Sequence, residues 1–269
     1  MPLRQGVNHQ PRETLVVHSR TKRTGSRVRI ASDFRDNLII DRYDPLFVGM
    51  RASKQEHLKS ANSEDAVTWN VFRSLRQIDA SCWLPELAQI GIPGHPTPPL
   101  SAVAVLLWAS LSPPPNLLVN GDEGDSEIDV LIEAPTWVWC VEAKLYSDIS
   151  TGTTTRPLRD QVLRNIDVGS FHAGVRDFYF SLLIHSQTRA KLGLKAVRQY
   201  QDLVATRSAL AGHRPDGLPN LRSVSVLTWA DLARVLASAE AQARRPGERA
   251  YATRAIAWLK KKGLDVVAD

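Results

Sequence analysis

Two carboxylates and a lysine lie in two short neighbouring segments of strand-like sequence, 127–133 and 136–144. Side chains of a β-strand alternate between its two faces. In extended form, Asp129 therefore lies on one face of the first segment, and Glu142 and Lys144 share a face of the second. If the segments pair as a hairpin, these three side chains gather on one side, and the other side is apolar and aromatic.

Carboxylate oxygens are the ligands that hard cations such as Mg²⁺ prefer. A bound divalent cation polarises a phosphoryl oxygen and lowers the pKa of a bound water. A nearby lysine orients or deprotonates the attacking water, or stabilises charge on phosphorus. Asp129, Glu142 and Lys144 therefore predict metal-dependent hydrolysis of a phosphodiester. The alternative is a solvated strand face with a surface salt bridge, which contributes little to stability.

The elements around the hairpin follow from local pattern. A helix is expected to begin at Ser63, a good N-cap residue, with Glu64 and Asp65 in its first turn and apolar residues at spacing four over 67–75. Alternation, apolar runs and turn residues predict the remaining elements. These are strands at 37–40, 102–109, 127–133, 136–144, 177–185 and 223–227, a helix at 156–168, and a helix that follows a capping box at Thr228 and Asp231.

Asp129, 12 intervening residues and then Glu142-Ala143-Lys144 resemble the D…(D/E)-x-K signature of the PD-(D/E)XK, or restriction-endonuclease-like, nuclease superfamily. The resemblance implies an α/β fold: an αβββαβ core with a mixed central sheet flanked by helices, here with helical C-terminal additions. The element order predicted over 63–185 agrees with that core. One departure is that Ile128, and not proline, precedes Asp129, which is a common variation.

Many members of this superfamily add a glutamate on the helix before the sheet and a glutamine on the helix after the E-x-K strand. Glu64 and Gln161 stand at those places. The resemblance thus implies Glu64, Asp129 and Glu142 as metal ligands for Mg²⁺, with Mn²⁺ as a substitute. It implies catalytic roles for Asp129, Glu142, Lys144 and Gln161. The alternative for Glu64 is a first-turn carboxylate that only favours the helix dipole, and Asp65 would be the substitute ligand. The alternative for Gln161 is an exposed helix residue.

The positive charge is unevenly distributed. The net charge is +6, and residues 1–60 hold 12 Lys and Arg against 6 Asp and Glu, whereas residues 61–269 hold 22 of each. We therefore expect a basic N-terminal extension at 1–60, a nuclease core at 61–190 and an α-rich part of the same domain at 191–269. A basic arm suits attraction to a phosphate backbone, and a solvated tail is the alternative.

Several classes of protein do not fit the sequence. The longest apolar run, 102–109, is far shorter than the ~20 residues of a membrane span. Because a signal-peptide stretch is also missing, we expect a cytoplasmic protein that does not bind membranes. Cys82 and Cys140 are too few for a disulfide scaffold or a zinc cluster. No G-x-S-x-G elbow or phosphate-cradling G-x-x-x-x-G-K loop occurs.

The expected partner is a nucleic acid, with DNA favoured, in restriction, defence or repair. A homodimer or a larger defence or repair assembly is compatible with this role. Two other interpretations stay open at this point. One is a catalytically inactive nucleic-acid-binding or assembly subunit that keeps the fold. The other is a nuclease that acts on RNA.

Overall fold

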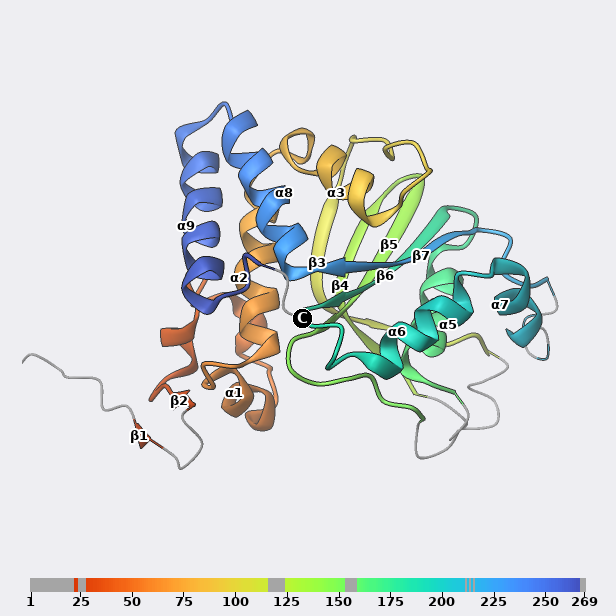
Figure 1. Cartoon of the computed structure of the whole chain (residues 1–269), viewed down its shortest axis with the longest axis horizontal. Coiled ribbons are helices and arrows are strands. Elements are labelled where there is room, and N and C mark those ends of the chain that lie inside the picture. Colours follow the sequence, from red (N-terminus) through yellow and green to blue (C-terminus); the bar gives the residue numbers. More distant parts are fainter. Residues whose placement is uncertain are drawn as a thin grey trace, which may run out of the picture.

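The computed structural model describes residues 28–115, 124–152 and 159–266 except 211, 213 and 215, together with the backbone of Lys22–Arg23. A five-stranded mixed sheet has helices on both faces (Figure 1). One apolar core lies between the sheet and helices α2, α3, α8 and α9. A second core lies between the opposite face and α5, α6 and α7. This is an α/β fold, as the sequence predicted.

The sheet has the strand order β3-β4-β5-β6-β7. Its first three strands are antiparallel, and β6 and β7 continue it in parallel with β5. The bounds are Ala104–Leu111 for β3, Ser126–Ala134 for β4, Trp137–Lys144 for β5, Asp177–Ile184 for β6 and Leu221–Thr228 for β7. The predicted hairpin is confirmed, and each of the other three predicted strands of this sheet falls within two residues of its observed place.

Two helices bring polar side chains to the sheet. Helix α2 spans Glu64–Arg76, and its N-cap Ser63 accepts a hydrogen bond from the backbone N–H of Ala66, as the sequence predicted. Helix α5 spans Gln161–Ala173, and its N-cap is Asp160. It begins later than the predicted 156, and residues 153–158 lie outside the described residues. Each cap fixes the residue at which its helix starts, and so fixes which side chains face the sheet.

The C-terminal part belongs to the same sheet and cores. It comprises α6 (Lys191–Tyr200), α7 (Leu203–Leu210), β7, α8 (Trp229–Gln242) and α9 (Pro246–Lys262). The capping box between Thr228 and Asp231 is present at the start of α8. Helices α8 and α9 lie beside α2 on the same face of the sheet (Figure 1).

The segment before α2 also packs against the core. It contains β1 (Lys22–Arg23), β2 (Arg29–Ile30), two 3₁₀ turns at Phe34–Asn37 and Pro45–Phe47, and α1 (Ala52–Leu58). Phe34, Phe47 and Leu58 are buried against α2. The side chains of residues 1–27, which include six of the 12 Lys and Arg residues of the basic N-terminal extension, lie outside the described part.

The predicted strand at 37–40 is wrong. A 3₁₀ turn capped by Asp33 runs into it, and Asn37 donates hydrogen bonds from its side chain to the carbonyl oxygens of Leu58 and Ser60. Leu38 and Ile40 are buried, but against α2 and not in a sheet. Alternating apolar residues alone do not distinguish a strand from a buried turn of this length.

Helix α3 (Leu84–Gly91), preceded by a 3₁₀ turn at Ala80–Cys82, was not predicted. Its last residue is glycine because a Cβ atom there would lie 2.5 Å from the Trp139 ring of β5. Both cysteines are buried and free, as expected. Within the described residues, no helix is both long enough and apolar enough to cross a membrane.

Candidate active site

The hairpin opens at Asp129. The backbone pairing between β4 and β5 runs from Ala134 to Val130 of β4 and stops before Asp129. There the side chain of Asp129 binds the neighbouring strand instead: its Oδ2 accepts a hydrogen bond of 2.9 Å from the backbone N–H of Ala143. On the other side, Trp108 of β3 lies opposite Asp129 and has φ +54°. A bulky residue rarely adopts that conformation, and such strain clusters at functional sites.

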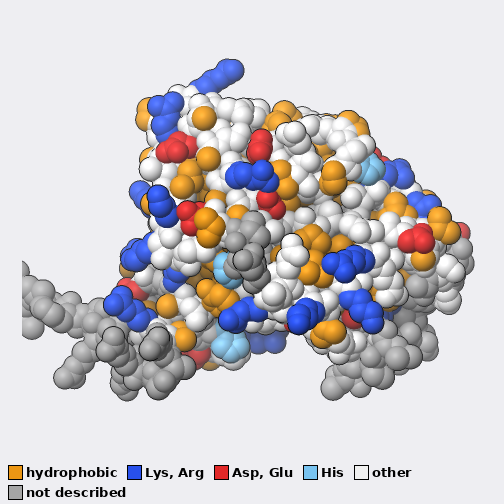
Figure 2. All heavy atoms as spheres, in the orientation of Figure 1, with side chains coloured by type: hydrophobic (Ala, Val, Ile, Leu, Met, Phe, Trp, Pro, Cys, Tyr) orange, Lys and Arg blue, Asp and Glu red, His pale blue; other side chains and the backbone are white. Residues whose placement is uncertain are grey.

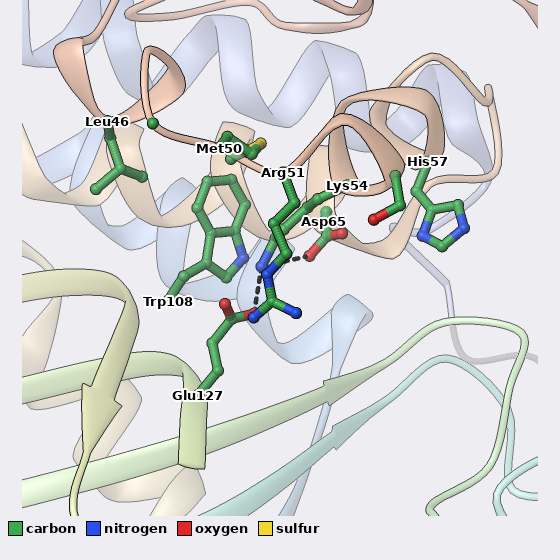
Figure 3. Close-up of a pocket in the computed structure, with 10 residues that line it drawn as sticks. Leu46, Met50, Arg51, Lys54, His57, Asp65, Trp108 and Glu127 are labelled. Atoms are coloured by element: carbon green, nitrogen blue, oxygen red, sulfur yellow. Dashed lines mark hydrogen bonds and ion pairs between the residues drawn. The ribbon is translucent and has the colours of Figure 1, made fainter. Parts of the chain in front are cut away.

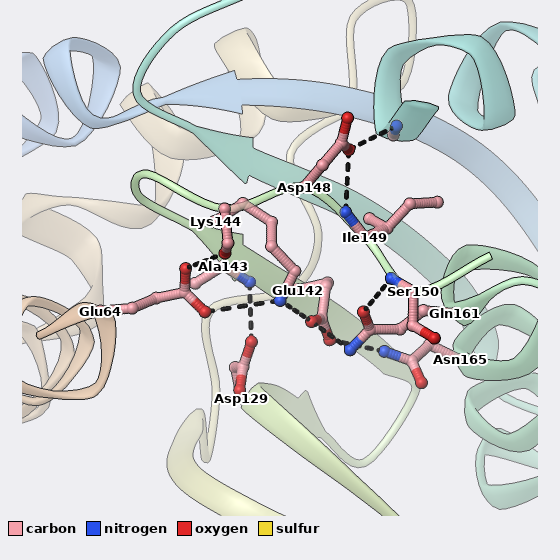
Figure 4. Close-up of polar contacts among 12 residues, drawn as sticks. Glu64, Asp129, Glu142, Ala143, Lys144, Asp148, Ile149, Ser150, Gln161 and Asn165 are labelled. Atoms are coloured by element: carbon pink, nitrogen blue, oxygen red, sulfur yellow. Dashed lines mark hydrogen bonds and ion pairs between the residues drawn. The ribbon is translucent and has the colours of Figure 1, made fainter. Parts of the chain in front are cut away.

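Glu142 and Lys144 lie next to each other on β5, facing α5 (Figure 4). The Lys144 Nζ atom is 2.6 Å from Glu142 Oε1. Glu142 is almost completely buried, and two amide groups of α5 hold it. Gln161 Nε2 donates to Oε1 at 2.6 Å, and Asn165 Nδ2 donates to Oε2 at 2.7 Å. The glutamate is therefore fixed in one orientation by three donors.

Glu64 completes the cluster from the first turn of α2. Its Oε1 is 3.4 Å from Lys144 Nζ, and its Oε2 accepts hydrogen bonds from the Leu145 N–H at 2.7 Å and the Ser147 hydroxyl at 3.2 Å. These contacts join the start of α2 to the end of β5. Asp65 does not take this place, because its carboxylate faces Lys54 at 3.7 Å.

All five residues singled out from the sequence meet at this point: Glu64, Asp129, Glu142, Lys144 and Gln161. The helix-dipole alternative for Glu64 does not account for its contacts with β5, and Gln161 is engaged with both Glu142 and the backbone N–H of Ser150.

Asn165 was not assigned a role from the sequence, although it touches the buried glutamate. The signal was its spacing: residues four apart share a helix face, so Asn165 stands above Gln161. Its Oδ1 atom is buried without a hydrogen-bond partner among the described residues. The Nε atom of the neighbouring Arg164 is likewise buried without such a partner.

The cluster carries an excess of negative charge. Desolvation, reinforced by the charge of Glu142, raises the pKa of Asp129 well above its usual range. Burial also raises the pKa of Glu142, although Lys144 opposes this shift. Burial alone would lower the pKa of Lys144, but the carboxylates of Glu142, Glu64 and Asp129 outweigh it and raise that pKa, so the amine stays protonated. If all three carboxylates were ionised around the one ammonium, two negative charges would be uncompensated, and the raised pKa values of Asp129 and Glu142 reflect that imbalance.

The described residues contain no ready-made group of three His, Cys, Asp or Glu side chains arranged to hold a metal. Here the carboxylate oxygens accept hydrogen bonds from the ammonium and amide groups instead. The oxygen atoms of these side chains nevertheless fit a hard cation, because every available metal ligand is a carboxylate oxygen and one divalent ion would balance the excess negative charge.

Two cavities lie near the cluster, and Glu64 lines the second of them. The first, of about 470 Å³, lies between α1 and the β3–β4 edge (Figure 3). Lys54 bridges Glu127 and Asp65 across it and lies over the Trp108 ring, 4.3 Å from its centroid. Glu127 is half-exposed and ion-paired with Lys54. The indole Nε1 of Trp108 is buried and has no hydrogen-bond partner in the described chain.

The second cavity, of about 540 Å³, contains Glu64 itself, together with Tyr146 and Ser147 beyond the end of β5. It shares His57 and Asp65 with the first cavity. We call the second cavity the trough, and a solute in it reaches the carboxylate of Glu64 directly.

No family model matches the chain, and no similar protein was found among curated proteins or solved structures. The function is therefore inferred from the chemistry and geometry of this cluster.

Proposed function

We propose that the chain is a metal-dependent nuclease of the PD-(D/E)XK type that hydrolyses phosphodiester bonds in DNA. The observation that carries the proposal is the meeting of three acidic side chains and one ammonium, contributed by α2, β4 and β5, at the mouth of an open trough. A solvated strand face would not bury Glu142 and Lys144 in this way.

The order of elements supports a restriction-endonuclease-like core. Helix α2 precedes three antiparallel strands, β3 to β5, and α5 then leads to the parallel strand β6. This is the αβββαβ order that the resemblance implies, with α3 inserted before β3. Strand β7 and helices α6 to α9 extend it.

In this proposal Asp129 and Glu142 hold Mg²⁺, or Mn²⁺ in its place, with the carbonyl of Ala143 beside them and Glu64 acting through water. The bound cation polarises a phosphoryl oxygen of the substrate and lowers the pKa of a water molecule. Asp129 stands where the β4–β5 ladder opens, and its Oδ2 accepts the Ala143 N–H beside Glu142 and Lys144.

Lys144 acts as a cation. Its ammonium, paired with Glu142, stabilises negative charge that develops on the phosphate and orients the attacking water. Gln161 and Asn165 are positioning residues, because they hold both oxygens of Glu142. Such outer contacts orient a ligand and raise its affinity for a cation.

A cleavage assay on single- and double-stranded DNA and RNA tests this proposal. Wild type, Lys144→Met and Asp129→Asn are compared with Mg²⁺, with Mn²⁺ and with EDTA, and Lys195→Met, an exposed lysine of α6, is the control. We expect each site substitution to reduce the rate by at least ~10²-fold and the control to retain activity. Cleavage that survives both site substitutions would refute the mechanism, and the panel decides between DNA and RNA.

One observation favours a second candidate, a nucleic-acid-binding protein of the same fold that does not cleave. In the described structure the ammonium of Lys144 and the amide groups of Gln161 and Asn165 already occupy the carboxylate oxygens of Glu142. That candidate predicts DNA binding with a steep salt dependence but no cleavage with either cation. The same assay, combined with a binding measurement, separates the two.

A further inference from the structure

A third cavity, with a polar lining, lies at the C-terminal end of α9. It has a volume of about 360 Å³ and opens between the segment around β2, the 3₁₀ turn at Phe34–Asn37 and the last turn of α9. We call it the basic groove. Its charged lining residues are four cations and one acid: Arg29, Lys59, Lys261, Lys262 and Asp36.

The cations of the basic groove are poorly compensated. Lys59 pairs with Glu56, but Arg29, Lys261 and Lys262 have no carboxylate partner in the described part of the chain. Lys262 is partly buried: its Nζ donates to the Ala61 carbonyl at 2.6 Å and lies 5.0 Å from the centroid of the Trp258 ring. Burial and the neighbouring Lys261 lower the pKa of Lys262.

The helix dipole explains only part of this cluster. Lysines in the last turn of a helix are favoured by the partial negative charge there, which accounts for a basic end of α9. It does not account for Arg29 and Lys59, which come from two other segments and line the same cavity. Cations from three separate segments that surround one hollow form a site of positive potential that attracts an anion.

The basic groove lies beside the candidate active site. Lys59 and Ala61 line the groove, whereas Ser60 and Asn62 line the cavity that holds Glu64. A single short segment, 59–62, therefore separates the two hollows. Lys and Arg side chains also extend along the left and lower margins of the face shown in Figure 2, and α9 and α1 form the left side of that view.

We propose that the basic groove binds the phosphate backbone of the nucleic-acid substrate, away from the bond that is cut. The identity of the ligand as a nucleic acid rests on the proposed function. Lys261 and Arg29, exposed and unpaired, contact phosphate oxygens, and Lys262 supplies charge from beneath. A strand that leaves the groove then crosses the segment 59–62 and enters the trough at Glu64.

The test compares two neighbouring lysines. Lys260 and Lys261 are both exposed in the last turn of α9, but only Lys261 lines the basic groove. Lys261→Gln and Lys260→Gln therefore remove the same charge from the same helix end. Binding of a labelled DNA duplex is measured by fluorescence anisotropy in EDTA, over a range of salt concentrations. Thermal unfolding of each variant checks that the fold is intact.

We expect Lys261→Gln to weaken binding by roughly three- to tenfold and to reduce the slope of log K against log salt by about one, while Lys260→Gln leaves both close to wild type. With Mg²⁺, Lys261→Gln should raise KM and leave kcat unchanged. Equal effects of the two substitutions, or no DNA binding by wild type, would overturn the inference. Because binding is measured without a cation, absence of cleavage by wild type refutes only the nuclease proposal.

Discussion

Replacing Asp129 with asparagine is expected to stabilise the cation-free protein and to abolish its response to magnesium. Asparagine has nearly the same shape, and its oxygen still accepts the hydrogen bond from the Ala143 N–H. The substitution removes the ionisable group whose charged form the site disfavours, because burial and the charge of Glu142 raise the pKa of Asp129 well above its usual range. Incomplete compensation of a buried polar group costs about 1–3 kcal/mol.

That gain corresponds to a measurable shift in melting temperature. For a chain of this size, 1 kcal/mol shifts Tm by ~2–4 °C, so Asp129→Asn should raise Tm by roughly 2–12 °C in EDTA. Wild type should instead gain stability from Mg²⁺. A ligand present at about 100 times its Kd stabilises the folded state by ~2.7 kcal/mol, which is roughly 5–11 °C here.

The measurement is thermal unfolding followed by circular dichroism, in EDTA and across a Mg²⁺ titration. Asp216→Asn, an exposed carboxylate outside the site, is the control and should behave as wild type does in both conditions. If Asp129→Asn melts below wild type in EDTA, or if the two proteins gain equally from Mg²⁺, the charge imbalance derived from the structure is not what governs this site.

Three further substitutions test neighbouring features. Gln161→Leu removes one donor to the buried glutamate of β5 and should reduce kcat by about 10- to 100-fold without changing DNA affinity in EDTA. Gly169→Ala places a Cβ 2.5 Å from the Phe178 ring and should cost about 1–3 kcal/mol in urea unfolding, whereas at Gly247 an added Cβ meets nothing within 4 Å, so alanine there is the control. Burial, with a nearby arginine, lowers the pKa of His185 below 6.5, so the folded state binds fewer protons than the unfolded chain. His185 therefore contributes stability that grows from about pH 5 to pH 7, and the stability of wild type relative to His185→Asn in urea unfolding should increase over that range; a constant difference would contradict this.

The sequence by itself determined the features that depend on local pattern. Alternation placed Asp129, Glu142 and Lys144 on the same side of a hairpin, and the observed strands β4 and β5 confirm that hairpin. Cap residues marked the starts of α2 and α8, because an N-cap side chain bonds a backbone N–H only two or three residues away. These signals need no knowledge of distant parts of the chain.

Tertiary structure alone decided which side chains meet. Only the packing of α2 against the end of β5 selected Glu64 over its neighbour Asp65, and only the approach of α5 brought Asn165 onto Glu142. The same holds for the basic groove, where Arg29 meets the last turn of α9. Contacts between residues so far apart in sequence leave no periodic trace, because they depend on how whole elements pack around a common core.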